Sequence, residues 1–192
     1  MEAMTRDEHE ARKARSYKLL LVFAMVSITM MFAGFTSAFV ISKSLGNWLK
    51  EIQIPSAFWL STIVIIGCSF TFEVAKRAIK NDNHARVKNF LWFTLALALL
   101  FVILQFFGFR QMIAQGNYFT GGSLTSTYIY VFAIMHLAHL FGGLIALARI
   151  IYNHFKKKYS SRQMVGIELG AMYWHFLDGL WLYLFLFLNF FK

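Results

Sequence analysis

Long apolar runs alternate with short polar connections along this chain of 192 residues. Apolar residues fill each run, instead of recurring at the second or the third and fourth positions that mark half-buried strands and amphipathic helices. The runs cover residues 18–42, 55–79, 90–109, 125–152 and 170–191. Each holds roughly the 20 residues that a helix needs to cross a hydrocarbon core about 30 Å thick. The pattern predicts an all-α, polytopic bundle of five transmembrane helices.

Composition supports lipid as the surrounding medium. Apolar residues make up 58% of the chain and charged residues 15%, whereas water-soluble domains have roughly 45–50% and about 25%. Membrane strands would be about ten residues long with alternating polarity, which these runs do not show. We therefore divide the chain into a short N-terminal tail, residues 1–17, and a transmembrane domain, residues 18–192.

The basic residues predict the orientation of the bundle, because cytoplasmic connections are enriched in Lys and Arg. One side would carry 15 of them: Arg6, Arg12, Lys13, Arg15, Lys18, Lys76, Arg77, Lys80, Arg86, Lys88, Arg149, Lys156, Lys157, Lys158 and Arg162. The other side would carry four: Lys43, Lys50, Arg110 and Lys192. The N-terminus is thus expected in the cytoplasm and the C-terminus outside. Because the net charge of +10 sits between apolar runs, we expect no nucleic acid as a partner.

The fourth run contains two histidines three residues apart, His136 and His139, which share a helix face. Gly143 follows on this face, where a small residue lets another helix approach closely. Two interpretations are open: ligation of a metal or haem, and a hydrogen-bonded packing role, which we favour.

The single cysteine, Cys68, excludes an intrachain disulfide and a Cys-based zinc site, and we expect it to be a small core residue.

The fifth run carries Trp174, Asp178 and Trp181 at i, i+4 and i+7, with His175 beside them and Glu168 near the start of the run. Ionisable residues in a membrane helix are costly and usually face the bundle interior. We predict that this face points inward and forms a buried polar network, with a proton path as the alternative. Because the depths of the fourth and fifth runs match, His136 or His139 is predicted to hydrogen-bond to Asp178 or His175.

A charged residue also stands near the end of the second run. Glu73 is followed by Lys76 and Arg77 at i+3 and i+4, a spacing that favours ion pairing on one helix face.

These motifs resemble subunit III of haem–copper terminal oxidases, the family of cytochrome c oxidase and quinol oxidase subunits III. The segment 166–187 is similar to the family's Glu followed by Trp-His-Phe-x-Asp-x-x-Trp, at Glu168, Trp174, His175, Phe176, Asp178 and Trp181. The segment 135–147 is similar to its His-x-x-His-x-x-x-Gly element, and MFAGFTSAF at 31–39 is similar to a third family stretch. Five helices match the shorter bacterial form.

Two positions depart from the family pattern. Where the family has a membrane-embedded glutamate after a serine, this chain has Ser27 followed by Ile28. A second family acid, downstream of a glutamine, is replaced by Gly108, which follows Gln105. A proton-related role of those carboxylates is therefore not expected here.

The resemblance implies a non-catalytic subunit of a proton-pumping terminal oxidase in aerobic respiration, with cytochrome c oxidase favoured over quinol oxidase. It implies no catalytic, cofactor-binding or metal-binding residue in this chain, with haem and copper in partner subunits. It further implies oxidase subunits I and II as partners, bound phospholipid, a multi-pass location in the bacterial cytoplasmic membrane, and a respiratory supercomplex as a further candidate partner. Subunit III of the family supports complex stability and proton uptake by subunit I. The alternative is a small transporter or channel subunit with a midplane His/Asp site.

Overall fold

The computed structural model describes residues 6–44, 53–121, 123–160 and 164–191. Its described residues form five helices, α1 (Arg6–Ser42), α2 (Ser56–Lys80), α3 (His84–Ala114), α4 (Leu124–Phe155) and α5 (Val165–Phe191). Each is long and apolar enough to cross a membrane. The predicted all-α bundle of five membrane-spanning helices is confirmed, and the chain is a multi-pass membrane protein. Lys50, Arg162 and Lys192 of the charge count lie outside the described residues.

Several helices extend beyond their apolar runs. α1 begins at Arg6, twelve residues before the predicted start at residue 18, and α3 begins at His84 instead of residue 90. The added residues include Glu, Lys, Arg and Ala, which have high intrinsic helix propensity, so the helix continues where the apolar run stops. Most of the predicted tail 1–17 is therefore helical. The 37 residues of α1 span about 55 Å, well beyond the hydrocarbon core.

Local sequence explains where helices begin. Pro55 precedes α2 with φ −53°, a value that its ring imposes and that suits a helix start. The side chain of Asn83 accepts a hydrogen bond from the Arg86 backbone N–H, and Ser123 accepts one from that of Ser126. These side chains cap the otherwise unpaired N–H groups at the starts of α3 and α4.

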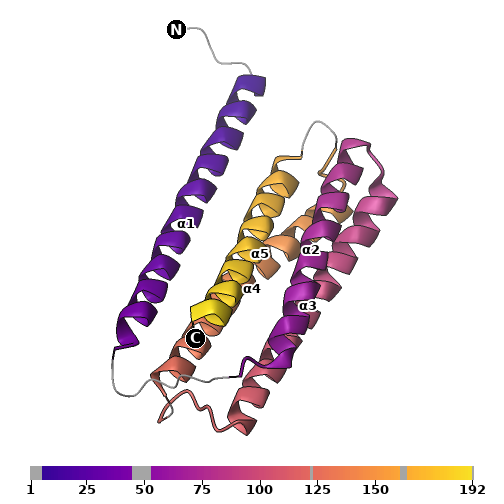
Figure 1. Cartoon of the computed structure of the whole chain (residues 1–192). Helices are drawn as coiled ribbons and strands as arrows, with labels where there is room; N and C mark the ends of the chain where they lie inside the picture. Colours follow the sequence, from indigo (N-terminus) through magenta and orange to yellow (C-terminus); the bar gives the residue numbers. More distant parts are fainter. Residues whose placement is uncertain (1–5, 45–52, 122, 161–163, 192) are drawn as a thin grey trace, which may run out of the picture.

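Figure 1 shows four helices grouped together and α1 standing to one side. α2 packs most extensively against α3, whereas α5 contacts α1, α2 and α4. In the described part of the chain α1 contacts only α4 and α5. Hydrogen bonds join the C-terminal half of α1 to α4 and α5. The hydroxyls of Ser42 and Tyr128 are 2.9 Å apart, and the Tyr183 hydroxyl donates to the Thr36 hydroxyl. α4 and α5 are thus the two helices that each contact three others in the described part of the chain.

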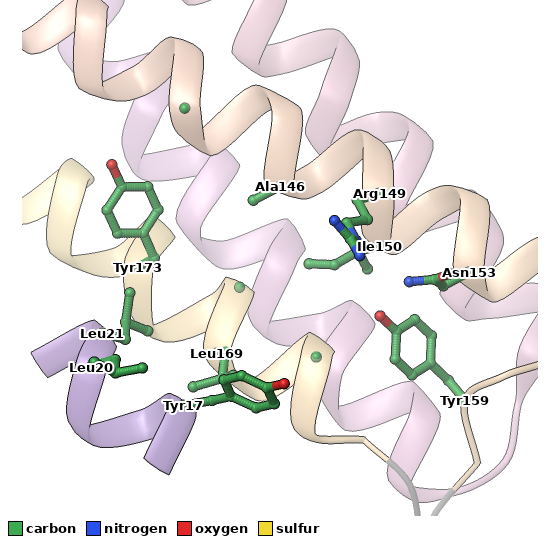
Figure 2. A pocket seen from close by; sticks show the side chains of 13 residues that line it. Tyr17, Leu20, Leu21, Ala146, Arg149, Ile150, Asn153, Tyr159, Leu169 and Tyr173 are labelled. Atoms are coloured by element: carbon green, nitrogen blue, oxygen red, sulfur yellow. The ribbon is translucent and has the colours of Figure 1, made fainter. Parts of the chain in front are cut away.

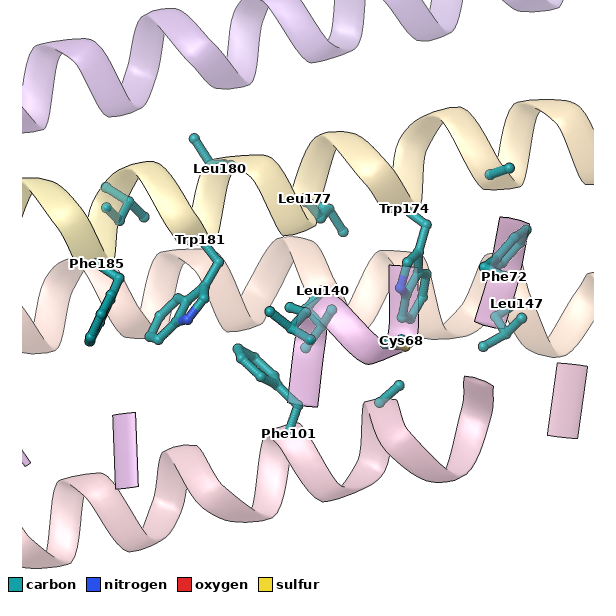
Figure 3. Close-up of a cluster of buried hydrophobic side chains, with 14 of the residues drawn as sticks. Cys68, Phe72, Phe101, Leu140, Leu147, Trp174, Leu177, Leu180, Trp181 and Phe185 are labelled. Carbon is teal, nitrogen blue, oxygen red and sulfur yellow. The ribbon is translucent and has the colours of Figure 1, made fainter. Parts of the chain in front are cut away.

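The core lies where α2, α3, α4 and α5 meet. Figure 3 shows Phe101 of α3, Leu140 of α4 and Trp181 of α5 converging there. Cys68 of α2 is fully buried beside them, and its thiol donates to the Thr94 carbonyl at 3.4 Å. The prediction that Cys68 is a core residue is confirmed.

Candidate functional site

The predicted inward face of α5 is confirmed. Trp174, Asp178 and Trp181 are all buried, because positions i, i+4 and i+7 lie on one side of a helix. The Trp174 ring stacks on Phe72 of α2, with centroids 6.0 Å apart and an interplanar angle of 21°. The Trp181 ring meets Phe101 of α3 edge-on at 5.2 Å. The two tryptophans therefore join α5 to two other helices by ring packing.

The predicted hydrogen bond from His136 or His139 to Asp178 or His175 is wrong. His136 is fully buried, and its ring packs against Trp181 with centroids 5.1 Å apart. Neither of its nitrogens has a hydrogen-bond partner among the described residues. His139 Nδ1 instead lies 2.7 Å from the Met135 carbonyl of its own helix. The two histidine rings pack and form no hydrogen bond to α5, whereas the backbone carbonyl of His139 accepts a hydrogen bond from the Tyr173 hydroxyl of α5 at 3.1 Å.

The physical reason lies in helix rotation. Residues three apart in an α-helix differ by about 60° around its axis. That difference directs His136 toward α3 and α5, and His139 toward α1, where its ring meets Phe32 at 5.9 Å. The close α4–α5 approach expected beside these histidines does occur. A Cβ added at Gly143 would lie 3.1 Å from Leu177 and 3.3 Å from Trp174.

Two polar side chains of α5, Trp181 and His175, face α2, whereas the Tyr173 hydroxyl of α5 donates to the His139 carbonyl of α4 at 3.1 Å. The indole N–H of Trp181 donates to Thr62 Oγ1 at 3.0 Å. His175 Nδ1 forms a hydrogen bond with the Ser69 hydroxyl. Neither Thr62 nor Ser69 was singled out from the sequence. Their spacing could have indicated this role. Hydroxyl residues seven apart in a membrane helix lie on one face, two turns apart, where they can hydrogen-bond to a neighbouring helix.

Glu73 completes this polar contact at the end of α2. Its carboxylate lies 3.1 Å from Lys76 Nζ and 3.2 Å from Arg77 Nε, as the i+3 and i+4 spacing predicts. The same carboxylate lies 3.5 Å from His175 Nε2. Ser69, Glu73 and His175 therefore form one interhelical group, which we call the α2–α5 polar cluster.

Asp178 lies beside Ser69 and Cys68 in the interface of α2 with α5. It is 7% exposed, and neither carboxyl oxygen has a hydrogen-bond partner among the described residues. Burying a carboxyl group without a partner costs free energy.

Glu168 stands apart from the other motif residues. It is exposed in the first turn of α5, where the positive end of the helix dipole stabilises a carboxylate. The structure therefore does not bring it into the α2–α5 polar cluster.

The two departures from the family pattern have structural counterparts. Ile28 of α1 is half-buried and packs against the apolar core. Gly108 of α3 is buried, and the Phe58 ring of α2 fills the space where its side chain would project. A glutamate at position 108 would have to displace that ring.

Metal-ligating residue types do not gather in the described part of the chain: no group of three or more His, Cys, Asp and Glu side chains is close enough to hold an ion. His175 is engaged by Ser69 and Glu73, and His136 lies among aromatic rings. The arrangement of these residues suits helix packing.

A cavity of about 620 Å³ lies between α1 and the α4–α5 pair. Tyr17, Leu20 and Leu21 of α1 form one wall. Arg149 and Asn153 of α4 line it, together with Tyr159 of the following segment. Figure 2 shows these three polar side chains on one side of the cavity and Leu20 and Leu21 on the other. An elongated molecule with a polar end and an apolar body fits this lining.

Five helices long and apolar enough to cross a membrane, a core rich in aromatic rings and a cavity beside an outlying helix define a polytopic helical membrane protein. Comparison with known proteins gives its family. The model of the family described as cytochrome c oxidase subunit III matches residues 1–192. The chain belongs to this family and is a subunit III of a haem–copper oxidase; the transporter or channel interpretation is not favoured.

Individual relatives agree with this assignment. The cytochrome c oxidase subunit 3 of Thermostichus vulcanus is 25% identical over 173 residues, which are 86% of this chain and 82% of the relative. The probable cytochrome c oxidase subunit 3 of Nocardia farcinica is 24% identical over 190 residues, 95% and 92% of the two chains. The subunit 3 of Locusta migratoria is 28% identical over 137 residues, and the match spans 49% of that longer protein. As a subunit III, the chain belongs to a multi-subunit oxidase complex.

Proposed function

We propose that this chain is a non-catalytic subunit of a proton-pumping haem–copper oxidase in the bacterial cytoplasmic membrane, with cytochrome c as the favoured electron donor over quinol. Its partners are oxidase subunits I and II, which hold the haem and copper. Its role is to keep subunit I durable during turnover by packing and by bound phospholipid. A respiratory supercomplex is a further candidate assembly.

The observation that carries this proposal is the cavity between α1 and the α4–α5 pair. α1 is held to the bundle through its C-terminal half, and its N-terminal half bounds the cavity. An acyl chain would lie along Leu20, Leu21 and Ala146, with the lipid phosphate near Arg149. A guanidinium binds phosphate oxygens through paired N–H donors.

The polar residues of the bundle support a packing role. The Glu73 carboxylate is paired with two cations at the end of α2, and Asp178 is enclosed beside two tryptophans. At the positions of the family's embedded acids stand Ile28 and Gly108, neither of which can carry a proton. We infer that this subunit supplies no obligatory proton carrier of its own.

Replacing Arg149 is expected to weaken lipid retention and shorten the working life of the oxidase. The purified Arg149→Gln oxidase should keep its haem spectrum and initial oxygen consumption but hold less phospholipid and lose activity faster during turnover. An oxidase depleted of this chain should lose activity at least as fast. The measurements are lipid phosphorus per haem and the decay of oxygen consumption over successive turnovers.

Lys156→Gln is the matched control, because this exposed residue lies near the same end of α4 without lining the cavity. Equal decay of both variants would contradict the lipid role of the cavity. Loss of haem on depletion would contradict the non-catalytic assignment.

The proposed orientation has its own test. A reporter fused after Lys192 is expected to be active only on the external side, because the sequence assigns 15 basic residues to the tail and connections of the opposite side. Alkaline phosphatase, which works outside the cytoplasm, and a cytoplasmic fluorescent reporter give opposite signals. Fluorescence without phosphatase activity would overturn the orientation.

A further inference from the structure

A second cavity, of about 710 Å³, lies where α3 begins and α4 ends. This is the end of the bundle that carries most of the basic residues, away from the Trp174–Trp181 face. The polar residues that line it are His84, Lys88, His154, Lys157, Tyr159 and Ser160. Tyr159 also lines the cavity beside α1, so the two cavities are neighbours with separate cationic residues.

Two histidines hold the wall of this cavity in place. His154 is 8% exposed, and its Nε2 donates to the His84 carbonyl at 3.2 Å. The two rings lie 5.6 Å apart with an interplanar angle of 37°. His154 Nδ1 has no hydrogen-bond partner among the described residues. The ring of His154 is thus held by a single hydrogen bond to the start of α3, which fixes its position in the wall.

Two lysines give the cavity its charge. Lys88 Nζ lies 5.6 Å from the centroid of the Phe155 ring. Lys157 adopts φ +53°, and its backbone N–H donates to the His154 carbonyl at 2.9 Å, so the chain turns there and places the lysine at the cavity. The N-terminus of α3 adds the positive end of a 31-residue helix. The described residues that line this cavity include no carboxylate.

The other residues that line the cavity offer both hydrogen-bond donors and an apolar surface, as a site for an amphiphile requires. The hydroxyls of Tyr159 and Ser160 can donate to phosphate oxygens, and the exposed Phe155 ring offers an apolar surface. Basic pockets between membrane helices at the cytoplasmic surface suit anionic lipid headgroups. The volume is within the range of small-molecule sites, roughly 300–1,000 Å³.

We propose that this cavity binds the phosphate of an anionic phospholipid headgroup, such as that of phosphatidylglycerol. Lys88 and Lys157 supply the charge, the start of α3 and the hydroxyls of Tyr159 and Ser160 supply donors, and the His84–His154 pair fixes the wall. The site is separate from the cavity beside α1, so it stands even if that cavity holds no lipid.

The test uses the intact oxidase in nanodiscs that contain phosphatidylcholine and spin-labelled phosphatidylglycerol. The immobilised fraction of the label measures binding. The double variant Lys88→Gln/Lys157→Gln should lower affinity for phosphatidylglycerol about tenfold or more, given roughly 1 kcal/mol per basic residue near an anionic surface. The matched double variant Lys80→Gln/Lys158→Gln removes two exposed charges at the same end that do not line the cavity, and should leave most of the affinity intact.

The outcomes separate the possibilities. Equal losses in the two double variants would overturn the proposal, because general surface charge would then account for binding. Spin-labelled phosphatidylcholine held as tightly as phosphatidylglycerol would also overturn it. Inorganic phosphate at millimolar concentration should not displace the lipid; displacement at that concentration would assign the site to free phosphate instead. The single variant His154→Phe removes the Nε2–H that donates to the His84 carbonyl, and it should weaken phosphatidylglycerol binding while the haem spectrum shows that the complex is assembled.

Discussion

Trp181→Ala is expected to destabilise the bundle by about 3 kcal/mol and to lower the yield of assembled oxidase severalfold. Replacing a buried tryptophan by alanine costs about 3–5 kcal/mol in water-soluble cores, and we expect the lower value because lipid is itself apolar. The Trp181 ring contacts the rings of Phe58, Phe101 and His136, at 6.0, 5.2 and 5.1 Å. Thermal unfolding in detergent and haem-normalised yield measure the effect.

Trp181→Phe separates ring packing from the hydrogen bond. It keeps most of the ring but removes the N–H that donates to Thr62, so it should cost only about 0.6 kcal/mol, the average for hydrogen bonds between membrane helices. The Thr62 hydroxyl keeps its bond to the Phe58 carbonyl at 2.8 Å. Trp92→Ala, at a half-exposed tryptophan of α3, is the control. A Trp181→Ala protein as stable as Trp92→Ala would contradict the packing role of the Trp181 ring.

Gly108→Ala is expected to destabilise the α2–α3 pair by about 1–3 kcal/mol, the usual cost of overpacking. Its Cβ would overlap the Phe58 ring. That ring is 3% exposed and is bounded by Phe109 and Trp181, so it cannot swing away freely. The larger Gly108→Leu should prevent assembly. Unfolding of the purified subunit and co-purification with its oxidase partners measure these effects.

Gly34→Ala is the matched control, because no atom lies within 4 Å of a Cβ added at this helical glycine. A second substitution tests the mechanism. In the Gly108→Ala background, Phe58→Leu should recover part of the lost stability, which gives a non-additive double-mutant cycle. If Gly108→Ala and Gly34→Ala unfold at the same temperature, the close contact with Phe58 does not limit this position.

The structure gives a physical reason why position 108 holds a glycine in this chain. In sequence, this position is a missing acid. In the bundle, it is a close approach of two helices filled by an aromatic ring. Restoring a carboxylate there would require a smaller residue at Phe58 as well. A larger side chain at this position would therefore compete with the Phe58 ring for the same volume.

The α2–α5 polar cluster changes the interpretation of the Trp-His-Phe-x-Asp motif. Its His175 side chain bonds to Ser69 and lies beside Glu73, so the polar part of the motif joins α5 to α2. The histidines of α4 pack against rings. The motif residues stabilise one interface by polar contacts and another by aromatic packing, which fits a structural subunit of the oxidase.

The sequence by itself determined the number and type of the spanning elements and the pairs that form within one helix. Five helices followed from run length, since backbone groups in lipid must bond inside their own segment. The pairing of Glu73 with Lys76 and Arg77 followed from helix geometry, which is local. The inward face formed by Trp174, Asp178 and Trp181 followed from the 3.6-residue period.

Only the tertiary structure decided which helices those faces meet. The fourth and fifth helices match in depth, but depth does not fix rotation, and about 60° separates His136 from His139 around the α4 axis. Contact between two side chains requires rotation, tilt and crossing to agree together, and these are set by packing of the whole bundle. For that reason Ser69 and Thr62 of α2, and not the imidazole rings of the α4 histidines, bond to the side chains of His175 and Trp181.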